Sequence, residues 1–196
     1  LDASPRYFTK GDNWNLIHTF DVPLVYAPDT VENKSHFGLG NMGYRMYVSP
    51  ASKGDWAWGL GPAIRASTGS SEIFEDNTTA VGVAMSVVYQ PMIFSMGGEL
   101  VQLWSNTVNE TLVHPIVDAH IGEKTTLGFL DTITVDWRAE EGQRFTIPMG
   151  IEIRQLFRSE LNTPLSVSFG VFGDVTRPDH ASDWHWTLRL DFVTSK

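Results

Sequence analysis

The end of the chain, from Trp184 to Phe192, alternates between apolar and polar side chains without a break. Because successive side chains of a β-strand point to opposite faces, this segment predicts a strand with one apolar face and one charged face. In a soluble sheet the apolar face would form the core. In a transmembrane barrel it would contact lipid, and the charged face would line a polar lumen. The same alternation recurs along the whole chain and therefore limits what it can fold into.

The composition narrows the choice of function classes. The 196 residues are 42% hydrophobic, which fits one domain spanning residues 1–196, and no segment reaches the roughly 18 apolar residues of a membrane helix. The formal net charge of −9 argues against nucleic acid as a partner, since little positive charge is available to neutralise phosphates. The chain has no cysteine, which excludes disulfides and thiolate metal sites. No phosphate loop or dinucleotide motif occurs, and no cofactor is predicted.

About ten long runs of strand-like sequence are separated by turn-forming residues, and no helical period is found. An eleventh strand is expected at 2–9. The ten runs are 14–26, 37–49, 55–67, 78–89, 92–105, 111–121, 125–138, 143–156, 164–176 and 184–194. Their length approaches the roughly 9–11 residues with which a tilted strand crosses a bilayer.

The connections between these runs tend to alternate in length. Those near 28–36 and 68–77 are long, whereas those near 50–54, 90–91 and 122–124 are tight. Long loops at one end and short turns at the other are typical of outer-membrane barrels. The rule is weaker later, where 157–163 is longer than 139–142.

The alternation assigns each charged strand residue to a face. If the apolar face is outward, the charged face would line the lumen and tune selectivity. The predicted lumen residues are Asp21, Arg45, Arg65, Glu99, Asp118, Asp136, Glu152, Arg154, Asp174, Arg189 and Asp191. Tryptophan lies mostly at strand ends, as expected for aromatic girdles at the two membrane interfaces. The predicted girdle residues are Trp14, Trp56, Trp58, Trp104, Trp137, Trp184 and Trp186.

Short motifs along nearly the whole chain resemble those of a known family. They are Trp14-Asn15-Leu16-Ile17, Pro23-Leu24-Val25-Tyr26-Ala27-Pro28-Asp29, Ser49-Pro50, Trp58-Gly59-Leu60-Gly61-Pro62, Gly98 with Leu103-Trp104-Ser105, His114-Pro115-Ile116, Val135-Asp136-Trp137, Ile147-Pro148-Met149-Gly150, Arg177-Pro178-Asp179 and Asp183-Trp184. In this order they resemble a bacterial outer-membrane β-barrel family labelled transporter-like, or linked by name to the meta-pathway of phenol degradation. The resemblance implies an all-β fold, an antiparallel up-and-down transmembrane β-barrel of about 10–12 strands.

The chain departs from that family in three places. It looks short by one or two N-terminal strands. It continues past Phe192 rather than ending on an aromatic residue, and it carries Thr19 where the family tends to have a basic residue. The resemblance therefore bears on fold and location more than on the solute.

Two histidine groups are weaker candidates for chemistry. His114, Asp118 and His120 share one strand face, but i and i+4 lie too far apart along a strand for one metal, so hydrogen bonding is the preferred interpretation. His180 and His185, near Asp179 and Asp183, form a second group in or beside a loop. No metal site is predicted. Ser67, Ser95, Ser166 and Ser168 would face inward, yet no Gly-x-Ser-x-Gly elbow occurs, so no enzyme is predicted.

These patterns predict a bacterial outer-membrane protein whose partners are the lipid bilayer and a small-molecule solute. It would act as a passive channel or transporter for a small, apolar or aromatic solute. Its constriction would be set by Arg45, Glu152, Arg154 and Arg189 with Asp136 and Asp191. One alternative is a closed barrel that serves as a structural subunit beside other membrane-protein subunits. Another is a soluble calyx that binds its ligand on an inward apolar face.

Overall fold

The computed structural model describes residues 2–11, 13–29, 34–51, 54–70, 78–158, 164–179 and 181–195. Within them the chain is all-β. Its thirteen strands are β1 (Asp2–Lys10), β2 (Trp14–Asp29), β3 (Lys34–Leu39), β4 (Met42–Pro50), β5 (Trp56–Ala66), β6 (Ala80–Tyr89), β7 (Phe94–Trp104), β8 (Asn109–Ile121), β9 (Thr125–Leu130), β10 (Ile133–Asp136), β11 (Phe145–Arg158), β12 (Pro164–Thr176) and β13 (Trp184–Ser195). In the described part of the chain, no helix is long and apolar enough to span a membrane.

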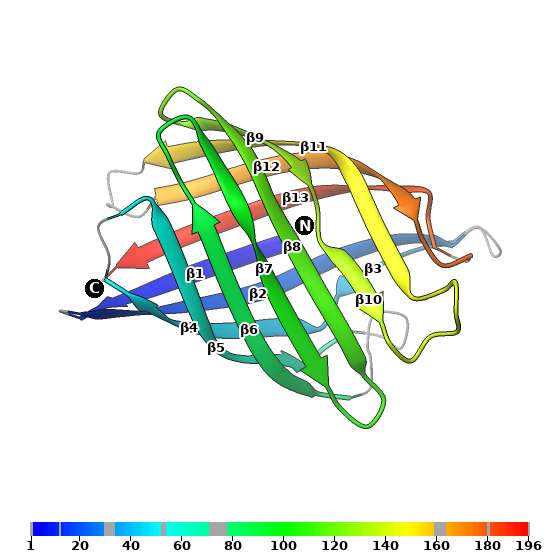
Figure 1. Cartoon of the computed structure of the whole chain (residues 1–196). Helices are drawn as coiled ribbons and strands as arrows, with labels where there is room; N and C mark the ends of the chain where they lie inside the picture. Colours follow the sequence, from blue (N-terminus) through cyan, green and yellow to red (C-terminus); the bar gives the residue numbers. More distant parts are fainter. Residues whose placement is uncertain are drawn as a thin grey trace.

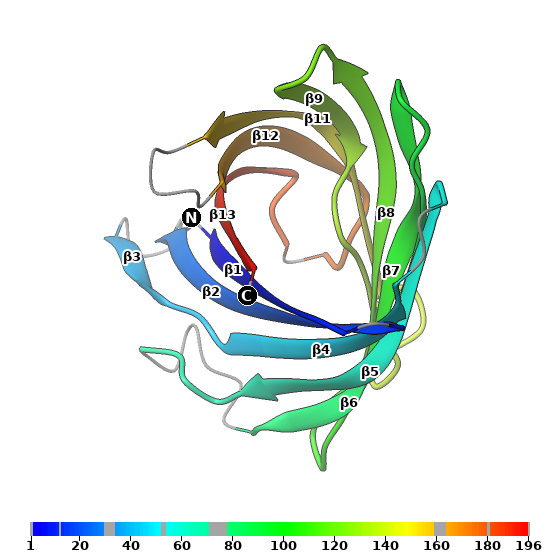
Figure 2. The same cartoon turned by 90° about the vertical axis from the view of Figure 1, so that its left-hand side faces the viewer.

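The strands form one sheet that closes on itself, because the last strand pairs with the first. Successive strands pair antiparallel from β4 through to β8 and from β11 to β13, as the predicted meander requires. β1 then pairs with both β13 and β2, which completes the circuit. Viewed from one end, the ribbons curve round in a ring (Figure 2). We refer to this arrangement as the closed sheet.

The thirteen strands fill eleven positions in the closed sheet, because β3 and β4 share the position beside β2, and β9 and β10 share the one between β8 and β11. When each strand reverses direction, a ring with an odd number of positions must contain one parallel pair. That pair is β1 and β13, and it is the exception to an otherwise antiparallel sheet.

Two predicted strands, 37–49 and 125–138, are each interrupted, and prolines of the neighbouring strands explain both breaks. The first falls at Gly40, beside Pro23 of β2, whose carbonyl accepts the Gly40 N–H at 2.9 Å. The second falls at residues 131–132. Continuing the registers of β9 and β10 places these residues beside Pro115 of β8 and Pro148 of β11. Proline cannot donate a ladder hydrogen bond, so the adjacent strand is interrupted.

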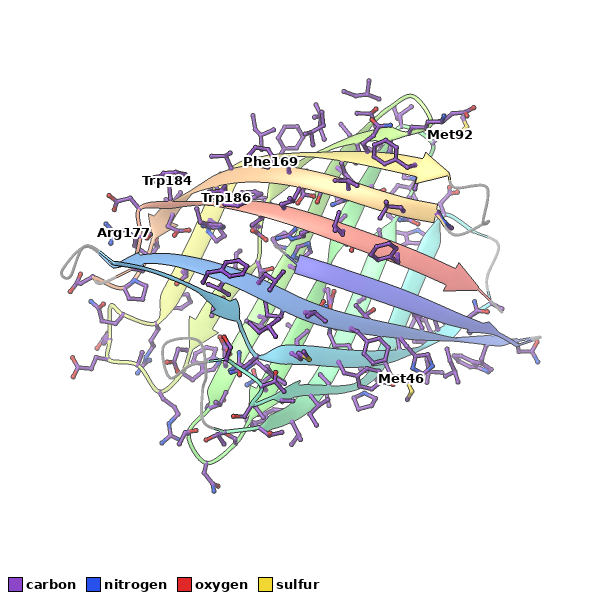
Figure 3. All side chains as sticks on the ribbon, turned by 180° about the vertical axis from the view of Figure 1, so that it is seen from behind. Met46, Met92, Phe169, Arg177, Trp184 and Trp186 are labelled. Atoms are coloured by element: carbon purple, nitrogen blue, oxygen red, sulfur yellow. The ribbon has the colours of Figure 1, made fainter. Side chains whose placement is uncertain are left out.

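The connections fall into two groups at opposite ends (Figure 1). The turn end has connections 11–13, 51–55, 90–93, 122–124 and 159–163. The loop end has connections 30–33, 67–79, 105–108, 137–144 and 177–183. Met92 and Arg177 mark the two ends in Figure 3. The predicted alternation in length holds late in the chain, because β10 ends at Asp136 and the connection 137–144 is longer than both 122–124 and 159–163. Earlier it does not hold throughout, because 30–33 is shorter than 51–55 and 105–108 is only as long as 90–93.

Candidate functional site: the charged inner face

Neighbouring residues of the closed sheet differ sharply in exposure. In β11 the side chain of Ile151 is 60% exposed, whereas Glu152 is 3% exposed. The buried set includes charged side chains that contact each other across intervening strands, for example Arg45 of β4 and Glu99 of β7. Only the concave side of a curved sheet allows such contacts. Charged residues therefore occupy the inner face, and the exposed apolar residues occupy the outer face.

The predicted tryptophans all lie on the outer face and gather at the two ends. Trp14, Trp56 and Trp58 lie near the turn end, where the Trp14 and Trp58 ring centroids are 6.4 Å apart and the Trp56 ring contacts that of Tyr89 with centroids 4.9 Å apart. Trp104, Trp137, Trp184 and Trp186 lie near the loop end, and each is 45% or more exposed. Trp184 and Trp186 project from β13 beside Phe169 (Figure 3).

Long polar side chains on the outer face bind one another. His18 and Tyr44 share a hydrogen bond of 2.8 Å. Thr125 donates to Gln155 at 2.8 Å. Near the loop end, Gln102 donates to Asn109 at 3.0 Å, and Thr111 donates to Gln102. A further bond to this group comes from the indole N–H of Trp137, which donates to Thr111 at 2.7 Å.

The first group of inner charges centres on Arg45. Its guanidinium donates to Asp21 of β2 at 2.6 Å and to Glu99 at 2.5 Å. The hydroxyl of Tyr47 donates to the same Glu99 oxygen at 2.5 Å. These contacts join β2, β4 and β7, and we call the four residues the Arg45 cluster. The predicted Asp21, Arg45 and Glu99 are thus brought together, whereas Tyr47 was not predicted although it shares their alternation.

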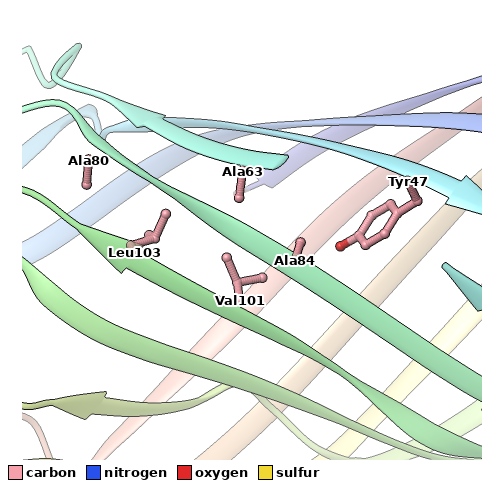
Figure 4. Packing of buried hydrophobic residues seen from close by; sticks show 6 residues of the cluster. All are labelled: Tyr47, Ala63, Ala80, Ala84, Val101 and Leu103. Carbon is pink, nitrogen blue, oxygen red and sulfur yellow. The ribbon is translucent and has the colours of Figure 1, made fainter. Parts of the chain in front are cut away.

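The Arg45 cluster reaches β7 because the two strands between carry small residues. Gly61 and Ala63 of β5 face Ala84 and Gly82 of β6 in register. Ala63, Ala84, Val101 and Leu103 form a buried apolar patch with the ring of Tyr47 (Figure 4). These small inward residues are tightly packed, since Ala84 is 0% exposed.

Arg65 lies closer to the loop end and forms a separate pair. It donates to Glu110 of β8 at 2.5 Å, again across two strands. Glu110 was not predicted because the expected strand began one residue later, at 111. The observed β8 begins at Asn109, which places Glu110 inward, opposite Leu103.

The second group of inner charges centres on Arg189 and includes six other residues. Arg189 donates to Glu152 at 3.0 Å and also to Asp131. Arg154 donates to Glu152 at 2.7 Å and to Asp118 at 3.1 Å. We call this group, completed by His185 and Asp174, the Arg189 cluster.

His185 lies between two carboxylates of the Arg189 cluster. Its Nε2 is 3.3 Å from Asp131 Oδ2, and its Nδ1 is 3.7 Å from Asp174 Oδ1. The ring of Phe172 stacks on the imidazole at 5.5 Å. The other predicted loop histidine, His180, lies outside the described residues.

Asp131 is an inner-face residue that the strand alternation does not predict. Strict alternation would turn it outward, but it sits at the break between β9 and β10 and is 5% exposed. Its Oδ1 accepts the N–H of Thr132 at 2.7 Å, in addition to the contact with Arg189. The two prolines beside the break are the sequence signal for this turn, but they become informative only once the strand pairing is known.

Two residues of the predicted constriction do not join these groups. Asp136 lies at the end of β10, is exposed, and accepts the N–H of Arg138 at 2.9 Å. Asp191 is on the inner face of β13, in register with Ser166, and no ion pair reaches it within the described part of the chain. The expected pairing of both aspartates with the arginines is therefore wrong. The carboxylates that contact Arg189 are Asp131 and Glu152.

His114 and His120 form hydrogen bonds on the inner face. His114 Nδ1 is 2.8 Å from Thr132 Oγ1. His120 Nε2 is 2.8 Å from Ser95 Oγ, and its Nδ1 is 3.2 Å from Thr126. Ser95 and His120 resemble a nucleophile and base, but a threonine stands where a hydrolase would need an acid. Among the described residues, no three acidic or histidine side chains form a group that could hold a metal ion.

The chain was also compared with known proteins. No family model, curated protein or solved structure matches it. The family resemblance stays a prediction, and the functional argument depends on the geometry of the two faces.

Proposed function

We propose that the protein is a membrane-spanning β-barrel of the bacterial outer membrane that gives small solutes a passive passage. The composition of the outer face is the main observation that supports this proposal. From Trp14 onward, the outward positions of the described strands, assigned by alternation and register, hold no Asp, Glu, Lys or Arg. A lipid-facing surface flanked by aromatic rings has this composition. The soluble calyx would require Ile151 inside and Glu152 outside, the reverse of the exposures given above.

The apolar band is long enough for a bilayer. On β11 the outward residues run from Phe145 to Phe157, with Ile151 midway. At about 3.3 Å per residue and a tilt of about 40°, this stretch rises roughly 30 Å, which matches the hydrocarbon core of a bilayer.

The outward polar residues also fit a lipid environment. An unpaired polar group in hydrocarbon costs several kcal/mol, so such side chains are expected to bind each other. The pairs of His18 with Tyr44 and Thr125 with Gln155 do so. In water these bonds would bring little advantage over solvation.

The inner face supports a narrow passage. Eleven strand positions at a spacing of about 4.8 Å and a tilt of about 40° give a backbone diameter of roughly 22 Å. Barrels of about eight strands are filled by their side chains, and this ring is wider. The inner face bears charges and hydroxyl groups, so we propose small hydrophilic solutes rather than the apolar or aromatic solute expected from the sequence.

A two-part experiment tests the proposal with the full chain. Reconstituted into vesicles containing brominated lipids, the protein should show quenched tryptophan fluorescence. Vesicles loaded with small solutes should swell isotonically, and planar bilayers should show conductance. Recovery as a soluble monomer without detergent would refute the membrane assignment.

A closed barrel that acts as a structural subunit is the second candidate. The observation that favours it is the packed patch around Tyr47 and Ala84, which fills part of the interior. Quenching by brominated lipid without swelling or conductance would support this candidate over the passage.

A further inference from the structure

The turn between β6 and β7 differs in composition from the other connections at the turn end. It reads Gln90-Pro91-Met92-Ile93 and has no charged residue, whereas each of the other four connections there contains at least one. Met92 is 97% exposed and Ile93 is 71% exposed, and Figure 3 shows Met92 at the extremity of this end. Turns usually carry polar residues, so two large exposed apolar side chains here indicate a contact surface. We call residues 90–93 the apolar turn.

The apolar turn is held by the strands on both sides of it. The Gln90 N–H donates to the carbonyl of Asp55, directly before β5, at 2.8 Å. On the other side, the Ile93 carbonyl accepts the N–H of His120 of β8 at 2.9 Å. These two bonds fix the backbone of the turn, so the exposure of Met92 follows from the closed sheet itself.

An apolar surface continues from the outer face to the apolar turn. The Tyr89 ring contacts that of Trp56, with centroids 4.9 Å apart, and that of Phe94, with centroids 6.0 Å apart. Tyr89 and Phe94 flank the apolar turn, and Trp56 is one of the tryptophans near this end. The outward positions of β6 and β7 hold no charged residue. The apolar turn therefore extends the outer apolar face past its aromatic rings.

The neighbouring turn, between β8 and β9, has the opposite character. Its residues Gly122, Glu123 and Lys124 are all exposed, and two of them are charged. Adjacent hairpins at one end of the sheet thus present an apolar tip and a charged tip. This contrast is expected where one tip enters lipid and the other stays with headgroups and water.

A lipid layer fits the apolar turn better than a protein surface does. Specific protein interfaces surround an apolar centre with hydrogen-bonding groups, and Gln90 is the only polar side chain of this turn. Insertion into lipid requires apolar side chains with aromatic rings at the headgroup level. Met92 and Ile93 supply the first, and Trp56 and Tyr89 supply the second.

We propose that the apolar turn inserts into the periplasmic leaflet of the outer membrane and anchors the hairpin of β6 and β7 there. This inference rests on the proposed membrane-spanning barrel, whose short turns face the periplasm, and it adds a specific lipid contact at that end. Met92 and Ile93 reach the boundary between headgroups and acyl chains, roughly 5–10 Å deep. The charged turn 122–124 remains among headgroups and water.

The depth of single labelled positions is the first test. The chain has no cysteine, so Met92→Cys, Glu123→Cys and Ile151→Cys each add one thiol for a nitrobenzoxadiazole label. In phosphatidylcholine vesicles, lipid brominated near the headgroup should quench the label at position 92 at least about twofold more than the label at position 123. The label at position 151, midway along β11, should be quenched most by lipid brominated near the chain ends.

The outcomes separate this inference from the proposed function. Equal, weak quenching at positions 92 and 123, with strong quenching at 151, would overturn the inference alone. Absence of quenching at all three positions would overturn the membrane-spanning barrel as well. Protection of position 92 that increases with the protein-to-lipid ratio, without quenching by lipid, would show that a second copy covers the turn and would also refute the lipid contact.

Stability provides a second test that needs no label. Because Met92 is almost fully exposed, Met92→Asp removes few contacts within the protein and would cost little if the turn lay in water. With the turn in lipid, the equilibrium constant for urea unfolding in phosphatidylcholine vesicles should rise about tenfold. Lys124→Asp, in the exposed charged turn, is the control and should change it by no more than about twofold. An equally small effect of Met92→Asp would refute insertion.

Discussion

The inner face of the closed sheet has two unlike walls. The wall from β4 to β7 is packed, because Tyr47 lies against small residues such as Ala84. The Tyr47 hydroxyl and the Arg45 guanidinium both donate hydrogen bonds to Glu99. The wall from β11 to β13 is polar, with buried hydroxyl groups of Ser168 and Thr187 that have no partner among the described residues. Both walls follow from the same alternation of inward and outward side chains along each strand. The two walls therefore differ in the size and chemistry of their inward residues, which the alternation alone does not specify.

The packed wall depends on close backbone approach, and Gly82→Ala should break it. A Cβ at Gly82 would lie 1.7 Å from the carbonyl oxygen of Gln102. β6 and β7 would have to separate, so we expect failure to fold or a loss of about 4 kcal/mol of unfolding free energy. The loss of unfolding free energy is measured by denaturant unfolding in detergent, monitored by tryptophan fluorescence. Gly173→Ala is the matched control, with its nearest atom 3.9 Å away; an equal loss there would contradict the argument.

The polar wall depends on Glu152, and Glu152→Leu should be the next most damaging change. Its side chain is 4% exposed and accepts from both Arg154 and Arg189, which would be left with unbalanced charge. We expect a loss of about 3 kcal/mol by the same unfolding measurement. Glu99→Leu, whose side chain is 19% exposed, should cost less. The reverse order would show that the Arg45 cluster is the more important of the two.

Leu103→Ala measures how well the packed wall is filled. Leu103 is 3% exposed within the apolar patch, so its truncation leaves a cavity and should cost about 2 kcal/mol. Leu100 of the same strand is 37% exposed on the outer face, and Leu100→Ala should cost less in detergent. Equal losses would mean that the inner patch is loosely packed.

Tyr47→Phe should have the smallest effect. It removes one hydrogen bond to Glu99 and keeps the ring against Ala84, so we expect a loss of about 1 kcal/mol. Unfolding midpoints of the variant and the natural chain, compared in one detergent, provide the measurement. A loss as large as that of Glu152→Leu would indicate that the hydroxyl organises the whole Arg45 cluster.

The strand pattern could be predicted because alternation is local. The face on which Ile151 or Glu152 lies follows from its position in the alternating sequence. The up-and-down order follows because each predicted strand pairs with the one that precedes it in the chain. The breaks at Gly40 and Asp131 could not be predicted in this way. Their cause lies in prolines of other strands, which become neighbours only after the sheet has formed.

The candidate site was harder to predict than the fold for the same reason. Alternation places Arg189 and Asp191 on one face, but it does not say which carboxylate each arginine meets across the ring. Arg189 meets Asp131, which a simple alternation would have turned outward. Ion pairs between distant strands depend on the diameter and shear of the closed sheet, and neither is encoded in a short stretch of sequence.

The parallel pairing of β1 with β13 has a mechanical consequence. Parallel strands exchange slanted hydrogen bonds and hold slightly less strongly per residue than antiparallel ones. Around the closed sheet, the line from Asp2 beside Arg189 to Phe8 beside Ser195 is thus the seam at which the wall should yield first. Thermal fluctuations would separate the strands first along this one line. In the proposed outer-membrane setting, sideways exchange between the interior and the bilayer would begin there.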